Sequence, residues 1–207
     1  MTSIGILGGT FDPVHHAHLQ VALTVLQGLQ LDEVRLIPCR QSPTRTAPLA
    51  SPEHRIAMLN LAVANESKLR VDDRECRRQG VSFTVDTLTE LRGEYPDAAL
   101  FFIIGVDAFN GLLAWHRWSE LFALAHIVVV SRPGEELVTQ GELSVVLAER
   151  GCQTRPSALA GSIITGLDCE LPHSASQIRK ALKAGDAVGA LMDKAVHDYI
   201  QENRLYQ

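Results

Sequence analysis

Short runs of aliphatic and β-branched residues recur along the chain, and their spacing limits the fold more than any other feature. The runs are SIGIL at 3–7, EVRLI at 33–37, LFFII at 100–104 and HIVVV at 126–130. Runs as apolar as FFII and IVVV are typical of strands that are covered on both faces. Strands that alternate with helices form βαβ units and a parallel sheet. We therefore expect an α/β fold, a doubly wound and mostly parallel sheet with helices on both faces.

The segments between these runs have helical periodicity. Apolar residues recur every three to four positions in 18–29 and in 51–64, and 85–95 is a further helix candidate. Ser51 is expected to cap the second of these helices, because Pro52 follows at the first helical position. The expected apolar faces are Leu19, Ala22, Leu23 and Leu26 in the first helix and Ile56, Leu59 and Val63 in the second. Neither a repeat nor a linker divides the sequence, so we expect one domain over 1–207, with a helical portion from about 174.

Composition narrows the class of protein. The 207 residues are 46% hydrophobic and have a net charge of −5, as in an ordinary soluble domain. A weakly acidic chain has no overall field that attracts nucleic acid or an anionic membrane, so we expect neither as a partner. The first apolar run is interpreted as a strand and not as part of a basic-then-apolar leader, so we expect no signal peptide. No apolar run is long enough to span a bilayer. The four cysteines lack CxxC spacing, which argues against a zinc site or a disulfide framework and favours the cytoplasm.

The stretch GGTFDPVHHAH, residues 8–18, directly follows the first apolar run. Ligands of open parallel sheets bind beyond the carboxyl ends of the strands. Gly8 and Gly9 are interpreted as the turn that leaves the strand, where the missing side chains let backbone N–H groups approach a ligand. Asp12-Pro13 is interpreted as the N-cap and the first residue of the next helix. A helix N-terminus at this place favours an anion.

Three histidines stand near the expected start of this helix. His15 and His18 are three residues apart and so lie on one helical face, whereas His16 turns away. Two imidazoles beside a helix N-terminus can donate hydrogen bonds to phosphate oxygens. The plainer alternative is a strand-to-helix turn with surface histidines, and a metal site is less favoured because no third ligand stands nearby in the sequence. The GxxxxGK[ST] motif is absent, and GxGxxG does not follow the first run.

A second motif, HSASQIR at 173–179, lies near the C-terminus. Ser174, followed three residues later by Gln177, has the spacing of a capping box and predicts a second helix N-terminus. Ser176 and Arg179 lie three residues apart on the face of that helix. A capped surface helix with one exposed arginine would explain the same residues, and the pairing with the first motif is what argues against it.

The two motifs together resemble those of the nucleotidylyltransferase superfamily. GGTFDPVHHAH is similar to its GGTFDPxHxGH signature, and HSASQIR to its ISSTxxR signature. Over the whole chain the sequence resembles the bacterial nicotinate-nucleotide adenylyltransferases. The further similar segments are SFTVDTL at 82–88, FIIGVDAF at 102–109, WHRWSEL at 115–121, VVVSRPG at 128–134 and the closing VHDYIQENRLYQ. The resemblance implies a Rossmann-like nucleotidylyltransferase fold and transfer of the adenylyl group of ATP to nicotinate mononucleotide, which gives deamido-NAD and pyrophosphate in NAD synthesis.

The resemblance also implies roles for residues that match the motifs. It makes His15, His18 and Arg179 the catalytic group, as donors to the phosphates of ATP. The implied ATP-binding residues are Gly8, Gly9, Thr10, Phe11, Arg45, Gly105, Asp107, Arg132 and Ser176. Among them, the backbone from Gly9 to Phe11 cradles the transferred phosphate, and Asp107 accepts from a ribose hydroxyl or caps a helix. Mg²⁺ is the implied cofactor, held by phosphate oxygens and water rather than by protein side chains.

Nicotinate mononucleotide is the implied acceptor, and three residues match its binding positions. Trp115 is implied to stack on the pyridine ring, while Trp118 is expected in the core. Thr84 and His116 are implied to receive the nicotinate carboxylate. Neutral N–H donors suit a carboxylate and leave the NH₂ of an amide unpaired, so we expect a preference for the acid form.

Departures from the family signatures keep two other functions open. Ala17 replaces the glycine of HxGH, Thr44 replaces a basic residue of the family's PPH[KR] segment, and His173 and Ser176 alter the second signature. An adenylyl- or cytidylyltransferase for another phosphorylated acceptor is one alternative, which the acceptor segments oppose. A non-catalytic nucleotide-binding relative is the other, which the retained phosphate-contacting residues oppose. The sequence leaves the oligomeric state open.

Overall fold

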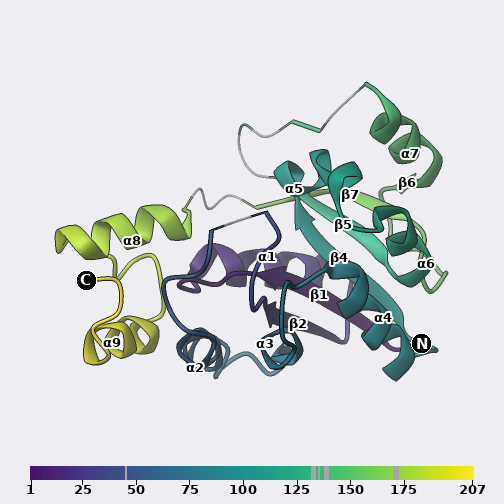
Figure 1. Ribbon diagram of the computed structural model, residues 1–207. Helices are drawn as coiled ribbons and strands as arrows, with labels where there is room; N and C mark the ends of the chain where they lie inside the picture. Colours follow the sequence, from purple (N-terminus) through teal and green to yellow (C-terminus); the bar gives the residue numbers. More distant parts are fainter. Residues whose placement is uncertain (45, 132–133, 135, 138–139, 170–172) are drawn as a thin grey trace.

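A computed structural model gives the fold of residues 1–207, and it describes all of them except 45, 132–133, 135, 138–139 and 170–172. Its centre is a twisted sheet with helices on both sides (Figure 1). The strands are β1 (Ser3–Gly9), β2 (Glu33–Pro38), β3 (Leu69–Val71), β4 (Ala99–Gly105), β5 (His126–Ser131), β6 (Gly151–Cys152) and β7 (Ile163–Asp168). The helices are α1 (His16–Gly28), α2 (Pro52–Ala62), α3 (Arg74–Arg77), α4 (Thr84–Glu94), α5 (Val106–Asn110), α6 (Leu121–Leu124), α7 (Glu142–Arg150), α8 (Ala175–Ala184) and α9 (Lys194–Glu202), with short 3₁₀ helices η1 (Leu112–Ala114) and η2 (Trp118–Glu120).

The order of the strands confirms the predicted doubly wound sheet. Across the sheet the strands run β3-β2-β1-β4-β5-β7-β6, and every neighbouring pair is parallel. From β1 the chain builds outward through β2 to β3, then returns to place β4 on the other side of β1. The strand order therefore reverses between β1 and β4. The carboxyl ends of these two strands mark the place where open parallel sheets bind ligands.

Two apolar cores lie on the two faces of the sheet, which explains why the strand runs are apolar throughout. Alternate residues of a strand point to opposite faces. In β4, Phe101 and Ile103 join a core with α1, α2 and α9, whereas Leu100, Phe102 and Ile104 join a core with α4, α5 and α6. The expectation that helices cover both faces is confirmed.

The buried faces of the first two helices differ from those expected. In α1 the buried stripe is Val21, Ala22, Val25 and Leu26, while Leu19 and Leu23 are only half-buried. In α2 the capping role of Ser51 is confirmed, because its Oγ accepts from His54 N at 3.4 Å. Leu59 is buried as expected, but Ile56 and Val63 are half-buried and Arg55 and Met58 take the core positions. Periodicity alone does not distinguish neighbouring faces of a helix, and tertiary packing determines which face is buried.

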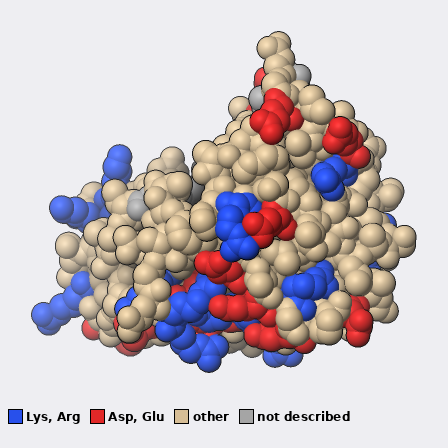
Figure 2. All heavy atoms as spheres, turned by 45° about the vertical axis from the view of Figure 1, so that its right-hand side comes forward, with Lys and Arg blue, Asp and Glu red and all other residues tan. Residues whose placement is uncertain are grey.

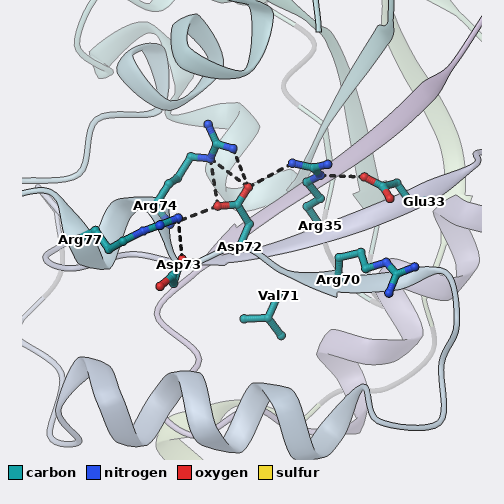
Figure 3. Close-up of a pocket in the computed structure, with 8 residues that line it drawn as sticks. All are labelled: Glu33, Arg35, Arg70, Val71, Asp72, Asp73, Arg74 and Arg77. Atoms are coloured by element: carbon teal, nitrogen blue, oxygen red, sulfur yellow. Dashed lines mark hydrogen bonds and ion pairs between the residues drawn. The ribbon is translucent and has the colours of Figure 1, made fainter. Parts of the chain in front are cut away.

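Paired charges hold the edge of the sheet at β2 and β3. Arg35 lies between Glu33, at 2.7 Å, and Asp72, at 3.4 Å. Arg74 joins the same Asp72 at 2.8 Å and reaches Glu94 at 2.9 Å. Glu33, Arg35, Asp72 and Arg74 are among the side chains that line an open hollow here (Figure 3). Its volume is about 350 Å³. Burial opposes ionisation of Asp72, but the hydrogen bonds from Arg74 outweigh it and lower the pKa of that carboxyl. The paired charges make this hollow a structural edge rather than a binding site.

Basic and acidic side chains are interspersed on the surface. On the face that Figure 2 shows, Lys and Arg lie beside Asp and Glu over its lower part rather than in a separate field. Exposed ion pairs such as Arg78–Glu90 and Arg117–Glu120 account for this mixing. Among the described helices, none combines the length and the apolar character that a membrane crossing requires.

Candidate active site

The first motif lies at the carboxyl end of β1, beside the point where the strand order reverses. Gly8 and Gly9 are the last residues of β1, paired with Ile37 and Pro38 of β2, so the interpretation of these glycines as a turn is wrong. The strand extends beyond the apolar run, because Gly9 O also accepts a hydrogen bond from Cys39 N at 2.9 Å. A Cβ at Gly9 would lie 3.1 Å from the ring of Phe11, so a side chain here would press on the loop that follows. The glycine therefore lets the backbone turn tightly after the strand.

The turn itself is made at Phe11. Its φ of 49° lies in the left-handed region, which costs about 1 kcal/mol for a residue other than glycine. Burial offsets this cost, because the Phe11 side chain is 1% exposed and packs in the core beneath α1 and α2. Thr10, just before it, is half-buried, and its Oγ1 faces the Cys39 thiol at 3.8 Å. We call the segment Gly8–Pro13 the phosphate loop, after the role predicted for it. The buried Phe11 side chain anchors this segment to the core.

Asp12 does not cap the helix. The expectation for Asp12-Pro13 is wrong, because α1 begins at His16 and its N-cap is His15. The Asp12 carboxylate instead accepts from Leu49 N at 2.8 Å and from Ala50 N at 3.0 Å. These hydrogen bonds join the phosphate loop to the segment before α2.

The histidines stand together at the start of α1. The rings of His15 and His18 lie 3.8 Å apart, centroid to centroid, and His15 N donates to His18 Nδ1 at 3.3 Å. Because Nδ1 of His18 accepts, the neutral ring has its proton on Nε2, the nitrogen that can donate to a phosphate oxygen. His16 turns away as predicted, with Nδ1 3.2 Å from the carbonyl oxygen of Ala190. His15 is 3% exposed, and its ring packs against the ring of His18.

The second motif reaches the first. The predicted capping box is confirmed, since Ser174 Oγ accepts from Gln177 N at 3.3 Å and Ser174 N donates to Gln177 Oε1 at 3.0 Å. This cap starts α8 in the orientation that turns Arg179 toward the phosphate loop. Arg179 Nη1 donates to Asp12 O at 2.7 Å, and its Nη2 donates to Ser176 Oγ at 3.3 Å. A plain surface helix does not explain these contacts, so the structure joins two motifs that stand 167 residues apart.

Gly105 and Asp107 follow β4, on the other side of the reversal. Gly105 ends β4 and is the N-cap of α5, so a capping role for Asp107 is wrong. A Cβ at Gly105 would lie 2.8 Å from Asp107 Oδ1, so only glycine leaves that carboxylate its present position. Asp107 is exposed beside the carboxyl end of β4, within the region where a nucleotide would lie.

The three predicted acceptor residues lie on neighbouring segments. Thr84 is the first residue of α4, and the ring of Phe83 before it lies 4.5 Å from the ring of His116. Trp115 is half-buried, edge-on to Phe102 of β4 with a centroid distance of 6.1 Å. Trp118 is also half-buried, and packs edge-on against Phe122 at 6.3 Å. The start of α4 and the loop before η2 therefore meet beside β4.

Three other sequence expectations are placed as follows. Arg45 and Arg132 lie outside the described residues. Ala17 is 2% exposed, so protein atoms already cover the methyl group that departs from the family glycine. An adenine ring would meet little of that methyl in this conformation.

Comparison with known proteins agrees with this arrangement. A family model described as cytidylyltransferase-like matches residues 6–181. A probable nicotinate-nucleotide adenylyltransferase of Cellvibrio japonicus is 43% identical over 210 residues, which cover 99% of this chain and 99% of the relative. One of Pseudomonas fluorescens is 45% identical over 208 residues, which cover 99% and 97%. The chain belongs to the nicotinate-nucleotide adenylyltransferase family.

Solved structures agree on the fold. The Plasmodium falciparum nicotinic acid mononucleotide adenylyltransferase complexed with NaAD superposes with a TM-score of 0.77 at 19% identity, over 100% of this chain and 98% of that one. A putative nicotinate-nucleotide adenylyltransferase from Vibrio parahaemolyticus gives a TM-score of 0.67 at 19% identity, over 100% and 96%. The fold expected from the nicotinate-nucleotide adenylyltransferase signatures is confirmed.

Tyr206 is a residue of the site that sequence reasoning missed. It is the penultimate residue, and its hydroxyl donates to Asp12 Oδ1 at 2.7 Å across 194 positions. Burial and the hydrogen bond to Asp12 raise the pKa of Tyr206 far above its ordinary value, so the hydroxyl keeps its proton. The chain end therefore closes over the phosphate loop. The resemblance of the closing segment to the adenylyltransferase family was the available signal, but nothing local in the sequence links it to Asp12.

Replacing Tyr206 by Phe tests this closure. The variant loses a charge-assisted hydrogen bond to a buried carboxylate, so we expect the free energy of unfolding to fall by about 2 kcal/mol. Tyr199→Phe is the matched control, because it removes a hydroxyl that bonds only the half-buried His54 ring at 2.9 Å, and should cost about 1 kcal/mol or less. Urea denaturation of both variants measures the difference. Equal losses would mean that the Asp12 contact does not hold the chain end.

Proposed function

We propose that this chain transfers the adenylyl group of ATP to nicotinate mononucleotide and releases pyrophosphate. The observation that supports this most strongly is the meeting of the two phosphate motifs, where Arg179 of α8 donates to the backbone of Asp12 in the phosphate loop. The meeting point lies at the carboxyl end of β1, next to the reversal of strand order. Cationic and N–H groups gathered there suit a polyphosphate.

The reaction needs little from the protein beyond position and charge. A phosphate oxygen of the mononucleotide attacks the α-phosphorus of ATP, a new O–P bond forms, and the bond to the β-phosphate oxygen breaks as pyrophosphate leaves. The attacking oxygen is already anionic, so no general base is required. The enzyme must hold two polyanions in line and stabilise the charge of the transition state.

The described residues divide this work between them. We assign the phosphate loop to the transferred phosphate, through the backbone of Gly9, Thr10 and Phe11. His18 donates from Nε2 to a phosphate oxygen, with His15 holding its ring. Arg179 and Ser176, already joined by a hydrogen bond, hold the leaving pyrophosphate. Asp107, beyond β4, accepts from a ribose hydroxyl of ATP. Arg45 and Arg132 keep their predicted places among the ATP-binding residues.

The donor set around the loop suits phosphate better than a metal ion. Within the described ranges, no group of three His, Cys, Asp or Glu side chains stands close enough to hold a metal. Both oxygens of Asp12 already accept hydrogen bonds, from Leu49, Ala50 and Tyr206. A Mg²⁺ ion would therefore be held by the phosphates of ATP and by water, and would neutralise part of their charge.

We assign the acceptor to the start of α4 and the loop before η2, which meet beside β4. We assign the pyridine ring to Trp115, which lies against Phe102, and the nicotinate carboxylate to Thr84 and His116. In the described chain no side chain caps the start of α4, and the N–H groups at a helix N-terminus favour a negative group. An amide would place its NH₂ against these donors.

The described cysteines form no disulfide bond, and cytoplasmic location remains our prediction.

Replacing Trp115 by Ala tests the pyridine assignment. Loss of the stacking surface should raise KM for nicotinate mononucleotide about tenfold, while KM for ATP changes less than twofold. Trp118→Ala is the matched control, because Trp118 is also half-buried but packs on Phe122. Steady-state kinetics with each substrate varied in turn supply the comparison. Equal effects of Trp115→Ala on the two KM values would count against stacking.

Product analysis with a chiral phosphorothioate analogue of ATP, labelled at the α-phosphorus, tests the reaction as a whole. We expect the phosphorothioate analogue of deamido-NAD and pyrophosphate in equal amounts, with inversion of configuration at that phosphorus, as a single in-line displacement requires. Retention of configuration would indicate a covalent enzyme intermediate and would overturn the mechanism. Bound ATP without any dinucleotide product would favour the non-catalytic relative.

A further inference from the structure

The largest fully buried side chain of the described chain is a charged one, Arg55 of α2. It is 0% exposed and lies on the buried face of α2 with Met58 and Leu59. Its Nη1 donates to the carbonyl oxygen of Thr10 at 2.8 Å, in the phosphate loop. The helix that follows β2 therefore holds the loop that follows β1 through a buried cation.

The hydrogen bonding of Arg55 is incomplete. Its Nε and Nη2 have no hydrogen-bond partner within the described part of the chain, and no carboxylate there lies within 4.0 Å of it. A guanidinium stays protonated when buried, so this positive charge is not neutralised. A buried charge without a counter-ion is costly, and such charges are usually paired. Arg55 is therefore a buried cation without an ion pair in the described chain, directly behind the phosphate loop. The carboxylate in the loop, that of Asp12, is occupied by hydrogen bonds from Leu49, Ala50 and Tyr206.

A half-buried arginine, Arg92, shows what a structural role looks like in the same chain. Arg92 of α4 donates to five backbone carbonyl oxygens, those of Tyr95, Pro96, Ala98, Leu124 and Leu159. It ties the ends of strands and helices together far from the phosphate loop, at the amino ends of β4 and β5. Arg55 has one such carbonyl, and that carbonyl belongs to the loop. Structural tethering explains Arg92 well and explains Arg55 poorly.

The charge of Arg55 reaches the groups around the loop. Burial raises the pKa of Cys76 and of Tyr206, and the positive charge of Arg55 works against both shifts. Cys76 lies in α3, where its thiol donates to Pro38 O at the end of β2 at 3.1 Å, and Tyr206 lies at the chain end. A cation shielded from water acts on an incoming phosphate more strongly than a solvated surface cation would.

We propose that Arg55 is a positioning residue for the phosphates, a buried cation that fixes the Thr10 carbonyl and favours anions in the phosphate loop. The role rests on the proposed function, because it concerns the same phosphates. The incoming polyphosphate brings negative charge to a buried cation that has no ion pair in the described chain. Part of the free energy that it costs to bury Arg55 is thus recovered when the nucleotide binds.

The test compares Arg55→Met with Arg92→Met, each beside its lysine counterpart. Calorimetry measures the binding of inorganic pyrophosphate and of ATP in the presence of Mg²⁺, without any acceptor. Arg55→Met should weaken both ligands on the order of tenfold, and Arg55→Lys should recover part of the affinity because it keeps the charge. KM for ATP should rise much more than KM for nicotinate mononucleotide. Arg92→Met should lower the unfolding temperature and leave pyrophosphate binding within twofold of wild type.

Two results would overturn the proposal. One is pyrophosphate and ATP affinity within twofold of wild type in Arg55→Met. The other is a loss of affinity in Arg55→Lys as large as in Arg55→Met, which would make the tether, and not the charge, responsible. The proposed function can fail independently of the proposal for Arg55. If wild type binds pyrophosphate through Arg55 but makes no dinucleotide, the role of Arg55 in phosphate binding stands and the assigned reaction does not.

Discussion

His18→Ala lowers kcat by a factor of about 10² to 10³, because it removes a donor directed at the reacting phosphates. His18 Nδ1 accepts from His15 N at 3.3 Å, which leaves Nε2 as the donating nitrogen. The ring also packs edge-on against Phe11 at 4.9 Å, so its position is fixed by the phosphate loop itself. Steady-state kinetics measure kcat, and single-turnover rapid-quench measurement of dinucleotide formation gives the rate constant of the chemical step apart from product release.

Two further variants separate the loss of a donor from a local packing defect. His18→Gln keeps an N–H donor near the same place and should recover part of the rate. His16→Ala is the matched control, because His16 stands on the same turn but contacts the carbonyl oxygen of Ala190. It should retain nearly full activity. A normal rate for His18→Ala would remove His18 from the mechanism.

The second large effect is expected for Arg179→Ala. Arg179 donates to Asp12 O and to Ser176 Oγ, and so both holds the phosphate loop and faces the phosphates. Its loss should lower kcat/KM for ATP by about 10² to 10³ and raise the dissociation constant for pyrophosphate. Arg179→Lys keeps the charge but not the two-pronged geometry, and should recover less than half of that loss in free energy.

Lys180→Ala is the control for charge on α8. Lys180 is the next residue on the same helix, and it is exposed. Its removal lowers the positive charge of the helix equally but breaks no contact with Asp12. We expect kcat/KM for ATP within twofold of wild type. A similar loss in both alanine variants would mean that α8 attracts ATP by charge alone, and would contradict a direct role for Arg179.

The sequence predicts the fold well because the strands are apolar on both faces. Runs such as LFFII have few other stable environments than the middle of a parallel sheet, and Phe101 and Phe102 do pack in opposite cores. The capping box at Ser174 is equally local, so it too is predictable. These features depend on neighbours within a few residues, and periodicity reports them directly.

The misplaced features depend on contacts that are distant in the sequence. Asp12 has the pattern of a helix cap, but the N–H groups of Leu49 and Ala50 compete for its carboxylate and α1 starts later. Arg55 stands where the helical pattern allows either face, and only its contact with Thr10 explains its burial. Tyr206 reaches Asp12 from the chain end. No local pattern reports such contacts, because they are created by the topology of the sheet.

The most direct test of adenylyl transfer to the acid form of the mononucleotide is a competition in one reaction. Wild-type enzyme receives ATP, Mg²⁺ and equal concentrations of nicotinate mononucleotide, nicotinamide mononucleotide and phosphopantetheine, and the initial rate of each product is measured by mass spectrometry. The proposed function predicts that deamido-NAD predominates over the other two products by a factor on the order of ten or more, because we assign N–H donors to the carboxylate. Predominance of either of the other products would contradict the acceptor site assigned to Thr84, Trp115 and His116.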